Sequence, residues 1–229
     1  MAREDFVSAA FPDTSTTTLH RGKLLKYAEP PELVVLVPAQ RTALKSEIEA
    51  ISGRMAADGL VTPFHSSISV YETFADVRRF NEQHGENGIF VLVGDVPDDS
   101  SQVTVLKSAL GPMLRWPNVI EELIEQSRAS RGFSSRNRIE FLTGEVVSTA
   151  TIVQSRYSDR EIGLMVYIAY YSALSPGASS AGQQFFSRFF EGVPRQSVEL
   201  TEFARQYFRV FADERVKFGM TKETFLACP

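Results

Sequence analysis

A run of serines on one face of a predicted strand is the first candidate for chemistry in this chain. In FHSSISVYETFADVRRF, residues 64–80, a strand is followed by an amphipathic helix. Because side chains alternate along a strand, one face carries His65, Ser67, Ser69 and Tyr71. This face either binds a ligand through its hydroxyl and imidazole groups or is the solvent-facing side of a half-exposed strand.

A second candidate is the Arg- and Ser-rich stretch SRASRGFSSRNR, residues 127–138, which we predict to be a loop. Its arginines are Arg128, Arg131, Arg136 and Arg138. They could contact the phosphates of a nucleotide or a nucleic acid, and Phe133 could stack on a base. The alternative is a solvated segment whose arginines are balanced by the acids at positions 121, 122 and 125.

Three short motifs occur in the order found in the ADP-ribosyltransferase fold of the arginine–serine–glutamate class, which splits the nicotinamide–ribose bond of NAD. LHRGKLL, residues 19–25, resembles the arginine–glycine element of that family. Ser67-Ile68-Ser69 resembles its serine–x–serine strand, and RNRIEFLTGEVV, residues 136–147, resembles the strand that carries the catalytic glutamate. The resemblance covers roughly residues 18–155, and it implies that NAD is the substrate.

The resemblance gives the matching residues binding roles. The guanidinium of Arg21 would bind the NAD pyrophosphate with two parallel hydrogen bonds, and Gly22 would let the backbone come close to it. Ser69 and His65, on the serine face, would contact the cofactor.

The same resemblance assigns catalysis to Glu140 and Ser67. The carboxylate of Glu140 would stabilise the positive charge that develops on the ribose, and the Ser67 hydroxyl would orient it. Arg138 stands where much of the family has a Glu or Gln that positions the acceptor. This difference argues against transfer to an arginine acceptor and leaves NAD hydrolysis, another acceptor or an inactive site.

Composition sets the class of protein. The 229 residues carry a net charge of -4, so no overall positive field favours nucleic acid or an anionic membrane. The single cysteine, Cys228, and three histidines lack the spacing of a metal site. Neither an apolar signal segment at the N-terminus nor a spanning run of about 18 apolar residues is present. We therefore expect a cytoplasmic protein without a metal or a membrane contact.

The elements that must position these residues indicate a mixed α/β core, roughly residues 19–155, with a central sheet flanked by helices. ELVVLV (32–37) and the apolar part of NGIFVLVGDVP (87–97) are typical of buried strands. A hairpin turning at Thr143–Gly144 is predicted near the end of this core. Residues 1–18 are expected to form an irregular arm, and residues 156–229 a helical, Phe-rich region of the same or a separate domain.

Nine of the seventeen phenylalanines lie in residues 185–225, and two adjacent pairs occupy positions 185–186 and 189–190. One helix cannot bury four such rings on a narrow stripe. Either the helix is buried on most sides, or it packs against a second subunit. The second case predicts self-association through the C-terminal helices.

Two further classes of function remain open at this point. A loose likeness to bacterial signalling sensor domains, in ISGRMAADG and GIFVLVGDVPDD, allows a non-catalytic sensory or interaction domain. The Arg-rich stretch together with the Phe-rich region allows an oligomer-forming, nucleocapsid-like RNA-binding protein.

Overall fold

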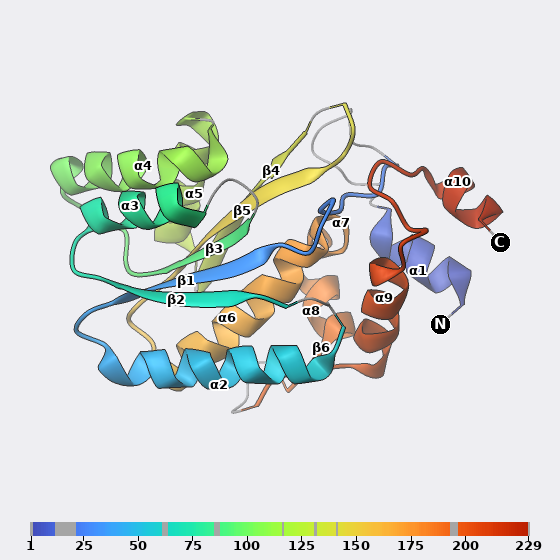
Figure 1. Cartoon of the computed structure of the whole chain (residues 1–229), viewed down its shortest axis with the longest axis horizontal. Helices are drawn as coiled ribbons and strands as arrows, with labels where there is room; N and C mark the ends of the chain where they lie inside the picture. Colours follow the sequence, from blue (N-terminus) through green and yellow to red (C-terminus); the bar gives the residue numbers. More distant parts are fainter. Residues whose placement is uncertain are drawn as a thin grey trace.

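The computed structural model describes residues 2–11, 22–60, 64–84, 88–115, 117–130, 132–140, 142–192 and 197–228, without the side chains at 81, 83, 84 and 117. Its elements, in chain order, are α1 (Arg3–Ala10), β1 (Glu32–Pro38), α2 (Thr42–Asp58), β2 (Ser66–Tyr71), α3 (Phe74–His84), β3 (Gly88–Val93), α4 (Ser100–Leu114), α5 (Pro117–Ala129), β4 (Phe133–Ile139), β5 (Val146–Val153), α6 (Asp159–Leu174), α7 (Pro176–Ser179), α8 (Gln183–Phe189), β6 (Phe190–Glu191), β7 (Glu199–Leu200), α9 (Glu202–Ala212) and α10 (Lys222–Ala227). Figure 1 shows their arrangement.

A five-stranded sheet in the order β2-β1-β3-β5-β4 forms the centre of the fold. Strands β2, β1, β3 and β5 are parallel, and β4 pairs antiparallel with β5. Every residue of β3 is buried, as is the middle of β1, because helices cover both faces of a largely parallel sheet. The predicted mixed α/β core with a central sheet is confirmed.

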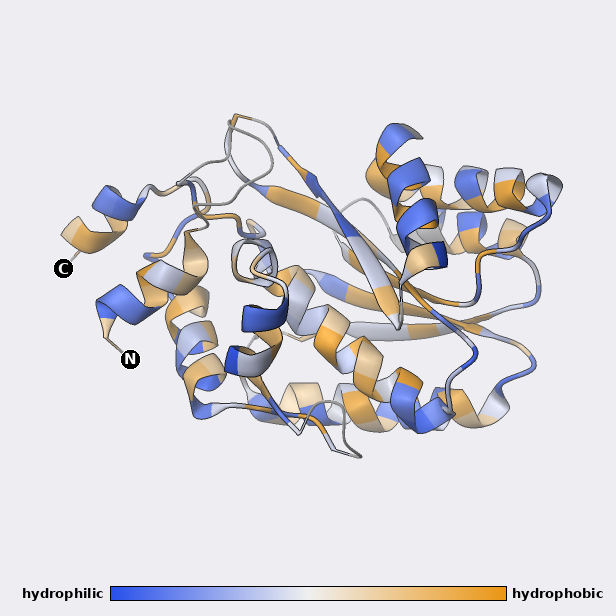
Figure 2. Cartoon of the chain, turned by 180° about the vertical axis from the view of Figure 1, so that it is seen from behind, coloured by the Kyte–Doolittle hydropathy of each residue, from blue (hydrophilic) through white to orange (hydrophobic). Residues whose placement is uncertain are grey.

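Helices cover the two faces of the sheet in different sets (Figure 1). On one side, α2 and α6 pack on Leu33, Val35 and Val37 of β1; we call this the α2–α6 face. On the other, α3, α4 and α5 pack around Val34 and Leu36; we call this the α3–α5 face. Figure 2 shows hydrophobic residues along α6 and the strands that it crosses. The alternation of β1 side chains therefore builds two separate hydrophobic clusters.

The C-terminal helices join the cluster of the α2–α6 face instead of forming a core of their own. Phe185, Phe189 and Phe190 are buried there, and Phe186 is partly buried against them. The two Phe pairs are therefore packed on most sides within a single chain. This packing removes the need for a second subunit to cover them, and self-association stays a prediction.

The expected irregular arm is wrong for Arg3–Ala10, which form α1. The ring of Phe6 stacks between Tyr207 and Phe225, with centroid distances of 5.0 and 4.7 Å. The helix has only eight residues, too few to show a periodic pattern in the sequence, and tertiary packing stabilises it. Residues 12–18 of the expected arm lie outside the described part of the chain.

One other expectation needed correction, and one helix was not predicted. The Arg-rich stretch is not a loop, because residues 133–139 form β4, whose alternate side chains face α5 and α6. Helix α4 was not predicted; its polar first turn and Pro112 near its end conceal the apolar stripe of Leu106, Leu110 and Met113. The hairpin at Thr143–Gly144 is confirmed, and it joins β4 to β5.

No helix in the described residues has both the length and the apolar character needed to cross a lipid bilayer.

Candidate site at the carboxyl edge of the sheet

The strand order separates the residues that the family resemblance had grouped. Ser67 and Ser69 lie on β2 at one edge of the sheet, whereas Glu140 directly follows β4 at the opposite edge. Strands β1, β3 and β5 lie between them, so four strand spacings of about 4.8 Å place the two edges roughly 19 Å apart. Arg21 lies outside the described residues. The sheet thus does not bring Ser67 and Glu140 into one site.

The remaining cofactor-binding candidates are also dispersed. Gly22 has a left-handed backbone (φ 76°), a conformation that favours glycine, and it lines a cavity beside α1, α7 and α10. His65 is exposed, and it lines a groove against α2 together with Ser66. Ser67 lies beside Val34 of β1 and so shares the α3–α5 face with Ser69. Ser67 and Ser69 therefore share one face of β2, whereas His65 lies before the start of the strand.

Acidic side chains of α5 pair with two of the described members of the arginine cluster. Arg128 lies 2.9 Å from the carboxylate of Glu125, and Arg136 lies 3.3 Å from that of Glu122. Arg138 is on β4, and Arg131 lies outside the described residues. The balanced alternative is thus observed for two of the arginines, which weakens the case for a phosphate-binding surface here.

The topology of the sheet points to a different place. From β1 the chain passes to α2 on one face, and from the adjacent strand β3 it passes to α4 on the opposite face. Neighbouring parallel strands whose connections leave to opposite faces form a topological switch point. In open α/β sheets, ligands bind outside the carboxyl ends of the strands at this point. The connections after β1, β3 and β5 all begin at this edge.

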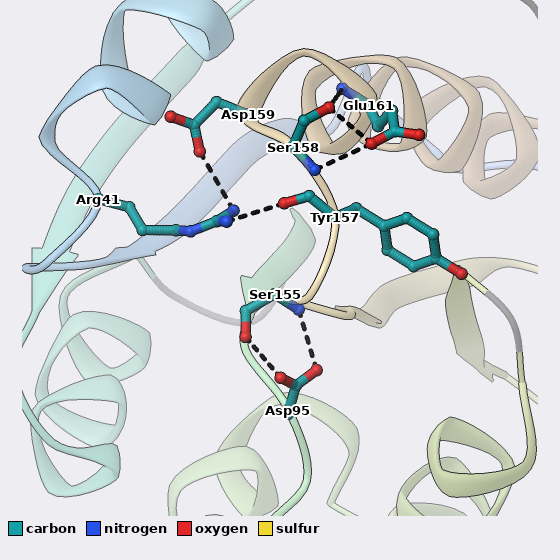
Figure 3. Close-up of polar contacts among 7 residues, drawn as sticks. All are labelled: Arg41, Asp95, Ser155, Tyr157, Ser158, Asp159 and Glu161. Carbon is teal, nitrogen blue, oxygen red and sulfur yellow. Dashed lines mark hydrogen bonds and ion pairs between the residues drawn. The ribbon is translucent and has the colours of Figure 1, made fainter.

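Hydrogen bonds between Asp95 and Ser155 link the connection after β3 to the connection after β5 (Figure 3). The carboxylate of Asp95, two residues after β3, accepts hydrogen bonds from the backbone N–H of Ser155 at 3.0 Å and from its Oγ at 2.6 Å. Ser155 is two residues beyond the end of β5. Asp95 is exposed, so the oxygen positions not used by Ser155 face solvent and can accept further hydrogen bonds from a ligand.

Arg41 joins the connection after β1 to the same segment (Figure 3). Its Nη2 donates to the backbone carbonyl of Tyr157 at 2.8 Å, and its Nη1 lies 3.1 Å from a carboxylate oxygen of Asp159. The side chains of Arg41 and Asp159 are 27% and 29% exposed, but the Nη1 atom that meets Asp159 is itself buried, so a ligand would reach it only if Asp159 moved away. An incoming anion could replace Asp159 as the partner of the guanidinium.

The first turn of α6 is fixed by its own capping box (Figure 3). The Oγ of Ser158 accepts from the backbone N–H of Glu161, whose carboxylate in turn accepts from the N–H and Oγ of Ser158. These bonds to Ser158 hold the pKa of the Glu161 carboxyl below its usual range. These hydrogen bonds fix the start of α6, directly after Ser155 and Tyr157, which contact Asp95 and Arg41. The carboxylate of Glu161 already supplies a negative charge at this helix N-terminus.

Tyr71, whose side chain lies on the α3–α5 face, stabilises the carboxyl end of β3. Its hydroxyl donates to the carbonyl of Val93, the last residue of β3, at 2.7 Å. Burial, and then the nearby charge of Asp95, raise the pKa of Tyr71, so the phenol stays protonated and remains a donor. The hydrogen bond holds the end of β3 where the Asp95 connection begins.

These contacts create a set of complementary groups at one edge. Arg41 supplies a cation, Asp95 a carboxylate, and Ser155 a hydroxyl, each from a different connection. No group of three or more His, Cys, Asp or Glu side chains suited to a metal occurs among the described residues. The set is suited to a ligand that offers both an anionic group and hydroxyl donors.

The sequence contained a signal for this site that was not used. In each case a polar residue closely follows a buried strand: Arg41 after β1, Asp95 after β3 and Ser155 after β5. Because the carboxyl ends of parallel strands lie at the same edge, this repetition could have indicated convergence. Comparison of the chain with known protein families, with curated proteins and with solved structures found no match.

Proposed function

We propose that this protein binds a small nucleotide-like ligand, carrying phosphate and hydroxyl groups, at the carboxyl edge of its sheet. One observation carries the proposal: Arg41, Asp95 and Ser155 converge from three separate connections at the topological switch point. NAD is the first nucleotide to test, because the family resemblance in the sequence implies it.

Each group has a distinct part in this proposal. Arg41 would bind a phosphate, exchanging the carboxylate of Asp159 for the new anion while keeping its bond to the Tyr157 carbonyl. The carboxylate of Asp95 would accept hydrogen bonds from sugar hydroxyls, in the way acidic residues hold a ribose in doubly wound sheets. Ser155 would keep that carboxylate in place through its N–H and Oγ.

The proposal concerns binding. If NAD is also cleaved, the proposal makes Asp95, and not Glu140, the carboxylate on which cleavage would depend. Cleavage requires a carboxylate beside the ribose that develops positive charge. Asp95 lies at the carboxyl edge, whereas Glu140 follows β4, which runs antiparallel to its neighbour and ends near the start of β5. If NAD is cleaved here, we expect Asp95→Asn to abolish the release of nicotinamide and Glu140→Gln to leave it intact.

Isothermal titration with AMP, ATP and NAD tests the proposal on the whole chain. A charged hydrogen bond contributes about 1.5–3 kcal/mol, so Arg41→Ala and Asp95→Asn should each weaken binding by roughly ten- to a hundredfold. Arg160→Ala is the matched control, because Arg160 is an exposed arginine on the same first turn of α6. Failure of all three nucleotides to bind, or equal losses for Arg41→Ala and Arg160→Ala, would contradict the proposal.

A further inference from the structure

A pocket separate from the carboxyl edge lies at the amino end of β1. It has a volume of about 400 Å³, which is within the range of small-molecule sites. Its walls come from the segment 26–31 before β1, the end of α6, helix α9 and the segment that follows α9. Apolar side chains dominate the walls, among them Leu174, Phe208, Phe211 and Phe218.

Lys26 and Lys217 both line this pocket, and Lys26 is the more buried candidate for a reactive amine. Its Nζ donates to the carbonyl of Val216 at 2.7 Å and lies 5.4 Å from the centroid of the Phe211 ring. The backbone carbonyl of Lys26 accepts from the N–H of Val146, so the main chain is anchored beside β5. The amine is therefore presented to the pocket from a fixed position.

The charges around this amine favour its neutral form. Burial, and then like-charge repulsion from Lys217, lower the pKa of Lys26 to about 8, while Asp213 acts in the opposite sense. Asp213 is itself paired with Arg215 at 2.7 Å, which reduces its effect on the amine. Glu29, Glu214 and the phenol of Tyr27 are the other titratable groups that line the pocket.

We propose that this pocket binds a small apolar aldehyde or ketone and that Lys26 condenses with its carbonyl group to form an imine. The pocket encloses a half-buried amine between aromatic and aliphatic walls, the arrangement that activates a lysine as a nucleophile, and a neighbouring cation strengthens the effect.

The atoms of this condensation balance with the amine and the carbonyl compound alone. The lone pair of Nζ attacks the carbonyl carbon, and proton transfer from nitrogen to oxygen gives a carbinolamine. The C–O bond then breaks, the oxygen leaves as water, and a C=N bond to Nζ remains. No oxidant or reductant takes part, and hydrolysis reverses the reaction.

The two proposed sites are independent. Lys26 lies near the start of β1 and Arg41 near its end, and the strand between them has seven residues, or about 20 Å at roughly 3.3 Å per residue. Loss of nucleotide binding would therefore leave this pocket intact, and loss of imine formation would not affect the carboxyl edge.

Trapping with cyanoborohydride tests the proposal. The full chain is incubated with benzaldehyde at about pH 7.5, where roughly a quarter of an amine of pKa 8 is neutral, against about 0.1% for an ordinary lysine. Part of this advantage is lost because a less basic amine is a weaker nucleophile. We expect peptide mapping to find Lys26 labelled at least about tenfold faster than each of the other five lysines of the chain.

Variants and a second probe complete the test. Lys26→Arg should remove the fast label, whereas Lys45→Arg, which alters an exposed lysine paired with Glu49, should keep it. Glyoxylate, a polar and charged aldehyde, should label Lys26 at least about tenfold more slowly than benzaldehyde, because the walls are apolar. Labelling spread evenly over the lysines, or equal rates for both aldehydes, would overturn the proposal without depending on any variant.

Discussion

The hydroxyl of Tyr71 occupies the space beside the α-carbon of Gly94. A β-carbon at residue 94 would lie 2.6 Å from this hydroxyl oxygen, well inside van der Waals contact. The same hydroxyl donates to the carbonyl of Val93, so it cannot move away without losing that bond. The absence of a side chain at Gly94 thus lets the Tyr71 hydroxyl of β2 reach the end of β3, where the Asp95 connection begins.

This relationship predicts that Gly94→Ala destabilises the fold by about 1–3 kcal/mol through overpacking. Urea denaturation measures the change. Gly53→Ala is the control, because a β-carbon at this position in α2 meets nothing within 4 Å. It should stabilise the chain by about 0.5–1 kcal/mol. In the double variant Gly94→Ala/Tyr71→Phe, which removes the clashing oxygen, the loss should be smaller than the sum of the single losses.

Asp58 is predicted to be the most sensitive polar residue of the helical layer. Its carboxylate, 10% exposed, pairs with Arg205 of α9 at 3.1 Å and accepts from the hydroxyl of Tyr171 of α6 at 2.9 Å. The hydroxyl of Tyr167 also donates to it, at 3.2 Å. Asp58→Ala leaves all three partners without this acceptor, so we expect a loss of about 2–3 kcal/mol in the free energy of unfolding.

The control for Asp58 is Glu82→Ala, since Glu82 pairs with Arg78 at 3.0 Å where both side chains are exposed. This change should cost less than about 0.5 kcal/mol. Asp58→Asn, which keeps one acceptor oxygen, should lie between the two. Equal losses for Asp58→Ala and Glu82→Ala would show that the interaction of Asp58 is as weak as a surface pair.

Ser67→Ala is expected to leave stability unchanged or to raise it slightly. The Oγ of Ser67 is buried and has no hydrogen-bond partner among the described residues, so its removal breaks no bond and relieves the cost of burying a polar atom. Thermal denaturation and the nucleotide titrations check both expectations. A large loss of NAD binding on Ser67→Ala, with stability intact, would restore the role that the family resemblance assigns to this serine.

The contribution of Lys26 to stability should depend on pH. Its pKa falls from 10.5 in the unfolded chain to about 8 in the folded one, so between these values the unfolded state binds more protons. Stability from this group therefore rises with pH through that window. Below it the amine is protonated in both states, and the cost of burying the charge is fully present.

Comparing the wild type with Lys26→Met isolates this effect. Urea denaturation at about pH 7 and about pH 10 should show the stability difference shifting in favour of the wild type at the higher pH. Because the amine is partly exposed, we predict the sign of the shift alone. A difference that stays constant with pH would mean that the folded and unfolded states hold this proton equally well.

The strands of this fold were predictable where burial is complete. β1 and β3 are continuous apolar runs, because helices cover both faces of the sheet, and such runs are visible in the sequence. Helix α1 was hidden, because its stability comes from rings that lie about two hundred positions away along the chain. The hairpin that contains β4 was predicted, but residues 133–138 of the strand were taken for a loop, because an edge strand with arginines and serines has the composition of one.

The candidate site was harder to predict, since strand order decides which connections meet. Ser67 and Glu140 were grouped from their order along the chain, but β2 and β4 are the two outermost strands. Arg41, Asp95 and Ser155 are equally far apart in sequence, and the order β1-β3-β5 makes them neighbours. The pattern of apolar residues contains little information about which strand lies beside which.

The stacking of Phe6 between Tyr207 and Phe225 has a consequence for synthesis. A ribosome releases α1 long before α9 and α10, so in the nascent chain Phe6 has none of these aromatic partners. The strands of the central sheet precede α9 and α10 in the chain (Figure 1), so the sheet can form before these helices complete the aromatic contacts of Phe6. Until then the apolar side chains of α1, Phe6 and Val7 among them, stay uncovered, and a chaperone that holds nascent chains could bind there.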